Sequence, residues 1–198
     1  ISVTDRCDLR CVYCMKEKME FLPKKDVLSL EEIERLCDNF IELGVKKIRL
    51  TGGEPLIRKN IITLIQNLNL KKQNTDLEEI TLTTNGTLLK KFAYELKKNG
   101  IDRINVSLDT LIKEKFKQIT RFGNLDNTLE GIEEARKNNI KVKINTVVFK
   151  NFNEEQINDL IKWSNDKLLD LTFIEVMPMS DTDMPRHMQF VSLDKIFN

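Results

Sequence analysis

The sequence predicts an α/β protein that folds as a partial (β/α)6 barrel of the TIM type. Helix and strand patterns alternate along the 198 residues, so consecutive strands are separated by helices and must run parallel. The internal strands also alternate apolar with polar residues, whereas a parallel sheet covered on both faces should be almost continuously apolar. A wide, incompletely closed barrel with helices outside and a wet interior accommodates both observations. The alternative is an antiparallel sheet with one solvated face, which the intervening helices disfavour.

Short strands and amphipathic helices account for most of the chain. A first strand is expected at residues 1–4, and a capping box at Ser29 and Glu32 begins the first helix. Gly44 and Gly100 are placed to end helices. The other strands are expected at Lys47–Leu50, Ile80–Thr84, Arg103–Leu108, Val142–Phe149 and Leu171–Met177, which makes six in all. Helices are expected at Leu30–Leu43, Asn60–Leu68, Leu88–Asn99, Leu125–Asn138 and Glu154–Ser164.

The polar face shared by the strands predicts a cationic, hydrogen-bonding interior. Its residues are Arg49, Thr51, Thr81, Thr83, Asn105, Ser107, Asp109, Lys143, Asn145 and Glu175. If the apolar faces pack against the helices, Arg49 and Lys143 point into one cavity. Two enclosed cations need anionic partners, so we expect a small ligand that bears phosphate or carboxylate groups.

Composition and charge exclude several classes of protein. Hydrophobic residues make up 40% of the chain and charged residues 32%, which suits one folded domain, or a domain of a larger protein, and argues against disorder. The 32 basic and 31 acidic residues are mixed along the chain, so no overall charge favours nucleic acid or a membrane surface. No apolar run is long enough to span a membrane. We therefore expect a soluble, cytoplasmic protein.

Three cysteines lie close together, directly after the first expected strand. Cys7, Cys11 and Cys14 fall within eight residues, which is a poor arrangement for a disulfide framework. A structural zinc site needs a fourth ligand, and the remaining candidates are Cys37, on the apolar stripe of a helix, and His187, in a polar loop. Three thiolates can instead hold three irons of a [4Fe-4S] cluster and leave the fourth iron open to a cofactor.

A glycine-containing segment follows the second strand. Thr51-Gly52-Gly53-Glu54-Pro55 lies at the carboxyl end of that strand, where barrels of this kind place their active sites. Two glycines allow the backbone to approach a ligand closely, and Glu54 can accept an ammonium group. Taken alone, the same residues are also typical of an ordinary turn.

The cysteine segment reads Arg6-Cys7-Asp8-Leu9-Arg10-Cys11-Val12-Tyr13-Cys14-Met15. This spacing, together with the Gly-Gly-Glu-Pro segment, resembles the radical S-adenosylmethionine (SAM) superfamily. The resemblance implies that the open iron binds the amino and carboxylate groups of SAM. It also implies that an electron from the cluster cleaves a carbon-sulfur bond and releases a 5'-deoxyadenosyl radical, which the protein positions and shields.

Further segments extend the resemblance to one family, the GTP 3',8-cyclases. They are residues 2–7 (SVTDRC), 49–56 (RLTGGEPL), 82–86 (LTTNG), 103–109 (RINVSLD), 121–125 (RFGNL), 173–179 (FIEVMPM) and 186–187 (RH). The resemblance implies that the ligands of the [4Fe-4S] cluster are Cys7, Cys11 and Cys14. The residues that it implies around SAM are Tyr13, Gly53, Glu54, Ser107 and Met177. The residues that it implies around GTP are Arg49, Thr83 and Lys143.

The resemblance also implies a reaction and its partners. In this family the radical abstracts the ribose 3' hydrogen of GTP, and the lyase product is 3',8-cyclo-7,8-dihydro-GTP, the first intermediate of molybdenum cofactor biosynthesis. The partners implied are GTP, an electron donor, a downstream cyclic pyranopterin monophosphate synthase and a second copy in a homodimer. Two alternatives remain: a radical SAM enzyme that acts on a peptide or a tetrapyrrole, and an iron-sulfur electron carrier, which would need a fourth ligand.

The chain departs from the family toward its C-terminal end. Family members hold a second [4Fe-4S] cluster with three C-terminal cysteines, and the sequence up to Asn198 contains none of them. We therefore expect a fragment: a partial radical SAM barrel at residues 1–178 and the start of a C-terminal extension at residues 179–198. On its own this chain is expected to be inactive. Lys16 also replaces the proline that commonly follows the Cys-Met pair.

Overall fold

One parallel sheet forms the centre of the protein, and the computed structural model describes residues 1–177, 182 and 189–197. The order of the five strands in the sheet is β1-β2-β3-β4-β5, so neighbours in sequence are neighbours in space. The strands are β1 (Lys47–Leu50), β2 (Glu79–Thr84), β3 (Arg103–Ser107), β4 (Lys141–Val148) and β5 (Asp170–Glu175). Each crossover contains a helix, which confirms the predicted α/β partial barrel.

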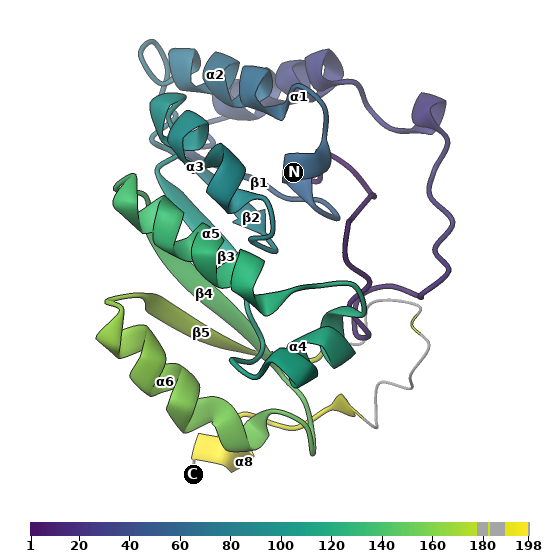
Figure 1. The fold of residues 1–198 in the computed structure, drawn as a ribbon. Coiled ribbons are helices and arrows are strands. Elements are labelled where there is room, and N and C mark those ends of the chain that lie inside the picture. Colours follow the sequence, from purple (N-terminus) through teal and green to yellow (C-terminus); the bar gives the residue numbers. More distant parts are fainter. Residues whose placement is uncertain (178–181, 183–188, 198) are drawn as a thin grey trace.

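Helices follow one another along one face of this sheet, and the N-terminal segment runs on the other side (Figure 1). They are α1 (Leu30–Glu42), α2 (Ile61–Lys71), α3 (Leu89–Lys98), α4 (Lys113–Thr120), α5 (Leu125–Lys137), α6 (Ile157–Asp166) and α8 (Asp194–Phe197). Shorter 3-10 helices are η1 (Lys24–Asp26), η2 (Pro55–Ile57) and η3 (Glu154–Gln156). The five expected helices are confirmed with slightly shifted ends, whereas α4 was not expected. Within the described part of the chain, no helix combines the length and the apolar character needed to cross a membrane.

The first expected strand, at residues 1–4, is a single bridge. Ser2 pairs with Thr51 in parallel orientation. The backbone bonds are Val3 N to Thr51 O at 2.8 Å and Thr51 N to Ile1 O at 2.9 Å. Thr51 lies just beyond β1, and the chain turns away at Gly52, so the ladder has no further partner. In the described residues the sheet therefore has five strands and not six.

The hydrophobic core lies between the sheet and the helices. The residues that β1 to β4 contribute are at most 6% exposed: Ile48, Leu50, Ile80, Leu82, Ile104, Val106, Val142 and Ile144. Cys37 of α1 is fully buried in the same core, which confirms that it is a core cysteine. The other zinc candidate, His187, and the expected domain boundary between residues 178 and 179 lie outside the described residues.

The opposite face of β1 to β4 is polar, as the alternation predicts. Three rows of paired residues cross it: Arg49-Thr81-Arg103, Thr83-Asn105-Lys143 and Ser107-Asn145. Paired residues in a parallel sheet point to the same side, so these side chains share the interior face. Arg49 and Lys143 therefore face the same interior, as expected.

The expected orientation of β5 is wrong. Glu175 pairs with Val148 and belongs to the face that packs against the helices, whereas Thr172 pairs with Asn145 on the interior face. Every residue from Leu171 to Glu175 is half-buried. Since both faces of this edge strand are covered to a similar degree, the alternation of apolar and polar residues does not identify the interior side.

Candidate functional site

The cysteine loop, defined here as residues 5–15, is held by hydrogen bonds to the end of α4. Arg10 N donates to Thr120 O over 3.1 Å. The Arg121 guanidinium donates to the carbonyl oxygens of Arg10 and Met15 over 3.0 Å and 3.1 Å. The helix that the sequence analysis missed is therefore the element that supports the loop along one side. Its eight residues bury only Phe116, Ile119 and Thr120, which leaves a weak helical pattern in the sequence.

The three cysteines of this loop fit an iron-sulfur cluster. Cys14 N donates to Cys11 O over 2.8 Å, which closes a tight turn between these two cysteines. Burial raises the pKa of the Cys11 thiol well above its ordinary value, and the nearby Asp109, Cys14 and Cys7 raise it further. No three His, Cys, Asp or Glu side chains among the described residues converge on the position of one metal ion. In a [4Fe-4S] cluster each cysteine binds a different iron, so thiols spread along one loop suit the cluster better than a single ion.

The Cys7 thiol is also neutral in the absence of a bound cation. Burial raises its pKa to about 11, the Leu9 N–H opposes that shift, and the carboxylates of Asp8 and Glu54 add to it. Binding of a metal cluster would therefore release protons from these half-buried thiols, as thiolate ligation does in general.

The glycine segment after β1 packs directly against the cysteine loop and the residues before it. Gly53 N donates to Thr4 O and Glu54 N donates to Arg6 O, each over 2.7 Å. A Cβ atom at Gly53 would lie 2.1 Å from Arg6 O, and one at Gly52 would lie 2.7 Å from Thr4 O. We expected the glycines to admit a ligand, but the close approach in the structure is to the chain's own backbone. Contact between Gly53 and SAM stays a prediction.

The Glu54 carboxylate is fully buried at the carboxyl ends of β1 and β2. Its Oε1 accepts from Leu56 N over 3.0 Å and from Thr84 Oγ1 over 2.8 Å, and its Oε2 accepts from Asn85 N over 2.8 Å. Burial raises its pKa to about 7, against the effect of these three hydrogen bonds. Glu54 therefore joins the loop after β1 to the end of β2. Three of its roughly four acceptor positions are filled, and the side chain has no exposed surface. Contact between Glu54 and the ammonium group of SAM stays a prediction.

Tyr13 is held by a buried carboxyl group that follows β3. The Tyr13 hydroxyl donates a hydrogen bond to Asp109, whose Oδ1 also accepts from Val147 N over 2.8 Å. The Tyr13 ring packs on Phe149 with 5.0 Å between the ring centroids. Burial raises the pKa of Asp109 to about 7, although both hydrogen bonds oppose the shift. Asp109 was expected to face the interior with no particular role, and the structure makes it the partner of the residue beside Cys14.

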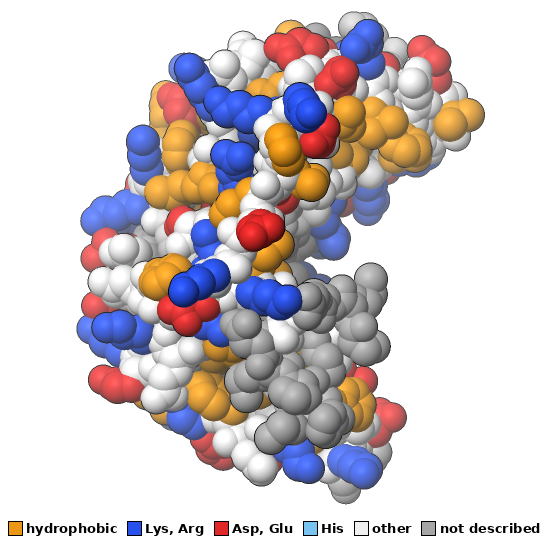
Figure 2. All heavy atoms as spheres, turned by 90° about the vertical axis from the view of Figure 1, so that its right-hand side faces the viewer, with side chains coloured by type: hydrophobic (Ala, Val, Ile, Leu, Met, Phe, Trp, Pro, Cys, Tyr) orange, Lys and Arg blue, Asp and Glu red, His pale blue; other side chains and the backbone are white. Residues whose placement is uncertain are grey.

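The interior face brings together the side chains expected to contact GTP. Thr83, Ser107 and Lys143 are half-buried and Arg49 is exposed. Neither Arg49 nor Lys143 has an ion-pair or side-chain hydrogen-bond partner in the described part of the chain. Asn105, in the row of Lys143, is 2% exposed, and its Oδ1 has no hydrogen-bond partner. Figure 2 shows lysine and arginine side chains around the hollowed middle of this side of the molecule. The arrangement suits a ligand with anionic groups and hydrogen-bond donors.

Met177 lies outside the sheet, so the direction of its side chain does not follow from the alternation along a strand. β5 ends at Glu175, and Met177 lies beyond it with 57% of its surface exposed. Its neighbour Val176 is buried in a small apolar cluster that also contains Ile119. The expected contact between Met177 and SAM stays a prediction.

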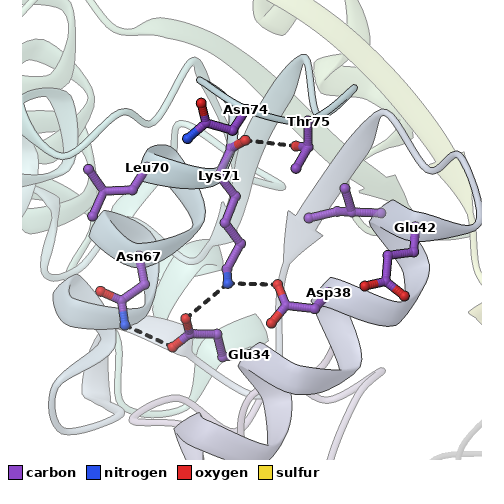
Figure 3. A pocket seen from close by; sticks show the side chains of 9 residues that line it. Glu34, Asp38, Glu42, Asn67, Leu70, Lys71, Asn74 and Thr75 are labelled. Carbon is purple, nitrogen blue, oxygen red and sulfur yellow. Dashed lines mark hydrogen bonds and ion pairs between the residues drawn. The ribbon is translucent and has the colours of Figure 1, made fainter.

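A pocket of about 590 Å³ lies between α1 and α2. Lys71 forms ion pairs with Glu34 at 3.2 Å and with Asp38 at 2.6 Å, and Asn67 Nδ2 donates to Glu34 over 2.8 Å (Figure 3). These charges are paired with one another. The pocket lies toward the C-terminal ends of both helices, near the amino ends of the strands, and hence away from the cysteine loop. It does not belong to the candidate site.

Sequence reasoning gave no role to Asp8, Asn85 or Arg121, all of which contact the cysteine loop or belong to it. Asn85 Nδ2 donates to Asp8 Oδ1 over 2.7 Å. The position of Asn85 in the sequence could have indicated a role at the site. Asn85 directly follows β2, at the end of the sheet where barrel active sites lie.

A comparison with protein families agrees with this fold and this loop. Residues 1–164 match the family model of the radical SAM superfamily. The chain therefore belongs to the radical SAM superfamily, and membership implies a [4Fe-4S] cluster and SAM as its cofactors.

Within the superfamily, the chain is similar to GTP 3',8-cyclases. It is 56% identical over 196 residues to the GTP 3',8-cyclases of Brucella ovis and Brucella canis, with 99% of this chain and 57% of each relative covered. The chain thus spans little more than half the length of these relatives. Among solved structures it resembles SAM-bound SuiB of Streptococcus suis, with a TM-score of 0.80 and 21% identity over 99% of this chain and 44% of SuiB. It also resembles the hydrogenase maturase HydG, with a TM-score of 0.76 and 17% identity over 100% of this chain and 46% of HydG. These two structural likenesses show the fold alone.

Gly53→Ala is expected to displace the cysteine loop and reduce iron binding. The new Cβ would meet the Arg6 backbone, which cannot swing aside as a side chain can. After anaerobic reconstitution, iron and sulfide analysis should show a severalfold loss per chain. Gly44→Ala is the control, because Gly44 has a φ of 90° but no atom within 4 Å of the added Cβ. It should lower the melting temperature through backbone strain and leave the iron content unchanged. Full iron loading of Gly53→Ala would contradict the packing described above.

Asp109 should make the free energy of unfolding fall as pH rises from about 4 to about 7. The unfolded carboxyl ionises near its ordinary pKa of about 4, whereas the folded pKa is about 7. The contribution of Asp109 to the free energy of unfolding is fully present below the unfolded pKa. It is lost as pH rises toward the folded pKa, by at most about 1.4 kcal/mol per pH unit. Asp109→Asn can bond both Val147 N and the Tyr13 hydroxyl and should reduce this slope. Urea unfolding of the metal-free chain at several pH values measures it, and an unchanged slope would show that Asp109 ionises normally.

Proposed function

We propose that this chain is the SAM- and GTP-binding barrel of a GTP 3',8-cyclase, which converts GTP to 3',8-cyclo-7,8-dihydro-GTP in the first step of molybdenum cofactor biosynthesis. The observation that supports the substrate best is the pair of interior cations, Arg49 and Lys143, which lack ionic partners among the described residues. They lie on β1 and β4, which are three strand spacings or roughly 14 Å apart. That separation suits an extended ligand with several anionic groups better than a single phosphate. The 56% identity to the Brucella ovis enzyme supports the same substrate.

The cysteine loop is proposed to hold the first cluster and SAM. Cys7, Cys11 and Cys14 would bind the [4Fe-4S] cluster, which together with SAM supplies a 5'-deoxyadenosyl radical that abstracts the ribose 3' hydrogen of GTP. The residues proposed to contact SAM are Tyr13, Gly53, Glu54, Ser107 and Met177. Tyr13 and Glu54 are suited to position a ligand, since buried hydrogen bonds to Asp109 and to the end of β2 already fix them.

The interior residues are proposed to bind the nucleotide. Arg49 and Lys143 would neutralise the triphosphate, the arginine through its planar fork and the lysine as a point charge. Thr83 lies in the same row as Lys143 and would hydrogen-bond GTP. None of the three needs to act as an acid or a base, because their role is to place the ribose beside the radical.

The rest of the proposal concerns the longer protein. We propose that it adds a second [4Fe-4S] cluster, which binds the purine end of GTP, and that residues 179–198 lead from the barrel at residues 1–178 into that part. An electron donor would reduce the first cluster, and a cyclic pyranopterin monophosphate synthase would take the product. A cytoplasmic homodimer is the proposed assembly.

Turnover by the full-length protein tests the proposed function. Under anaerobic conditions with SAM, dithionite and GTP deuterated at the ribose 3' carbon, the protein should form the cyclised nucleotide and deuterated 5'-deoxyadenosine. Mass spectrometry detects both products. Unlabelled 5'-deoxyadenosine without a cyclised nucleotide would overturn the GTP assignment and favour a peptide or tetrapyrrole substrate.

Lys143→Ala should weaken GTP binding and leave the iron-sulfur cluster intact. A charge-assisted contact contributes about 1.5 to 3 kcal/mol, so its loss should raise the Kd for GTP roughly 10- to 100-fold. Isothermal titration calorimetry on the reconstituted full-length protein measures this change. The matched control is Lys137→Ala on α5, where the side chain is 73% exposed, and neither its Kd nor its iron content should change. Equal Kd values for Lys143→Ala and the wild type would remove Lys143 from the GTP site.

A further inference from the structure

The side chain of Asn85 reaches the sulfur atom of a proposed cluster ligand. Asn85 Nδ2 lies 3.8 Å from Cys7 Sγ, and the backbone N of Leu9 donates to the same sulfur over 3.4 Å. One donor belongs to the cysteine loop itself, and the other comes from the end of β2, 78 residues along the chain from Cys7. Asn85 therefore connects the sulfur to the sheet.

The orientation of the Asn85 amide is set by its neighbours. Oδ1 accepts from Thr87 N over 3.0 Å, so the NH2 group must face Asp8 and Cys7. The Asn85 backbone N donates to Glu54 Oε2 over 2.8 Å, which fixes the main chain as well. The donor is thus held toward the sulfur by contacts that do not involve the sulfur.

Asp8 places a negative charge beside the same sulfur. Asp8 Oδ1 lies 3.8 Å from Cys7 Sγ and accepts from Asn85 Nδ2 over 2.7 Å. Its Oδ2 lies 2.7 Å from the Thr87 hydroxyl. An N–H donor stabilises the extra negative charge of a reduced cluster, and a neighbouring carboxylate destabilises it. Asn85 and Asp8 therefore have opposite effects on the reduction potential of a cluster bound here.

We propose that Asn85 is a positioning residue for Cys7 that raises the reduction potential of the [4Fe-4S] cluster, and that Asp8 lowers it. The inference rests on the proposed cluster site. The cluster must accept an electron from a donor and pass it to SAM, so the balance between these two side chains regulates the first step of the proposed reaction.

Potentiometric titration of the reconstituted chain, followed by EPR spectroscopy, tests this inference. Asn85→Asp keeps the acceptor for Thr87 N, removes the N–H donor to sulfur and places a carboxylate beside it. Both changes act in the same direction, so its midpoint potential should be more negative than that of the wild type. Asp8→Asn removes the charge and should give a more positive potential. We expect each shift to be about 59 mV, which is a tenfold change in the equilibrium constant of a one-electron reduction.

Two distant substitutions match these changes in charge. Asn139→Asp adds a carboxylate at an exposed left-handed position after α5, and Asp126→Asn removes one that pairs with Lys113. Neither control should shift the potential.

The outcomes separate this inference from the proposed function. A wild-type chain without any [4Fe-4S] signal would overturn the proposed function and this inference together. A normal signal with potentials of Asn85→Asp and Asp8→Asn equal to those of their controls would overturn the inference alone. If Asn85→Asp binds no iron, the sign of the Asp8→Asn shift decides, and a shift to more negative values contradicts the proposal.

Discussion

The buried carboxylate of Glu54 is the interaction on which the site depends. Its three hydrogen bonds join the loop after β1 to the end of β2, and its backbone N bonds Arg6 in the cysteine loop. Burying a carboxylate costs free energy, and a pKa of about 7 shows that these donors only partly offset the cost. Two of the donors, Thr84 and Asn85, lie at the end of β2, which the parallel sheet holds in place. The cysteine loop consequently rests on the glycine segment, the end of β2 and the end of α4, and these supports come from distant parts of the sequence.

Burial gives the cysteine loop its electrostatic character. Thiols with raised pKa values carry protons when no cation is near, and three adjacent thiolates are stable only with positive charge among them. Asp8 adds further negative charge to the surroundings, and Asp109 and Glu54 do so once pH rises above their pKa values of about 7. The groups that oppose it are N–H donors, including the Arg10 guanidinium, which donates to Cys7 O over 2.6 Å. The loop is therefore suited to an iron cluster, whose own charge replaces the protons.

The parts of the fold that could be predicted are those with a periodic signal. Helices between consecutive strands exclude hairpins and so predict a parallel sheet. The alternation of apolar and polar residues identified the interior face of β1 to β4, because the two faces of these strands differ in burial. The same reasoning failed for β5, whose faces are buried alike, and for α4, whose three buried residues leave only a weak helical pattern in the sequence. The assignment of Cys7, Cys11 and Cys14 as cluster ligands rests on their spacing and stays a prediction. The contact of Asn85 with Asp8 joins residues 77 positions apart and becomes visible only when the strands are in register.

If Cys7, Cys11 and Cys14 hold a cluster with one open iron, SAM must bind directly to that cluster. EPR spectroscopy of the reduced, reconstituted chain before and after addition of SAM tests this requirement most directly. We expect a [4Fe-4S] signal whose g values change when SAM binds, because three cysteines leave one iron available. A [4Fe-4S] signal that SAM does not alter, or a cluster of another type, would contradict this expectation.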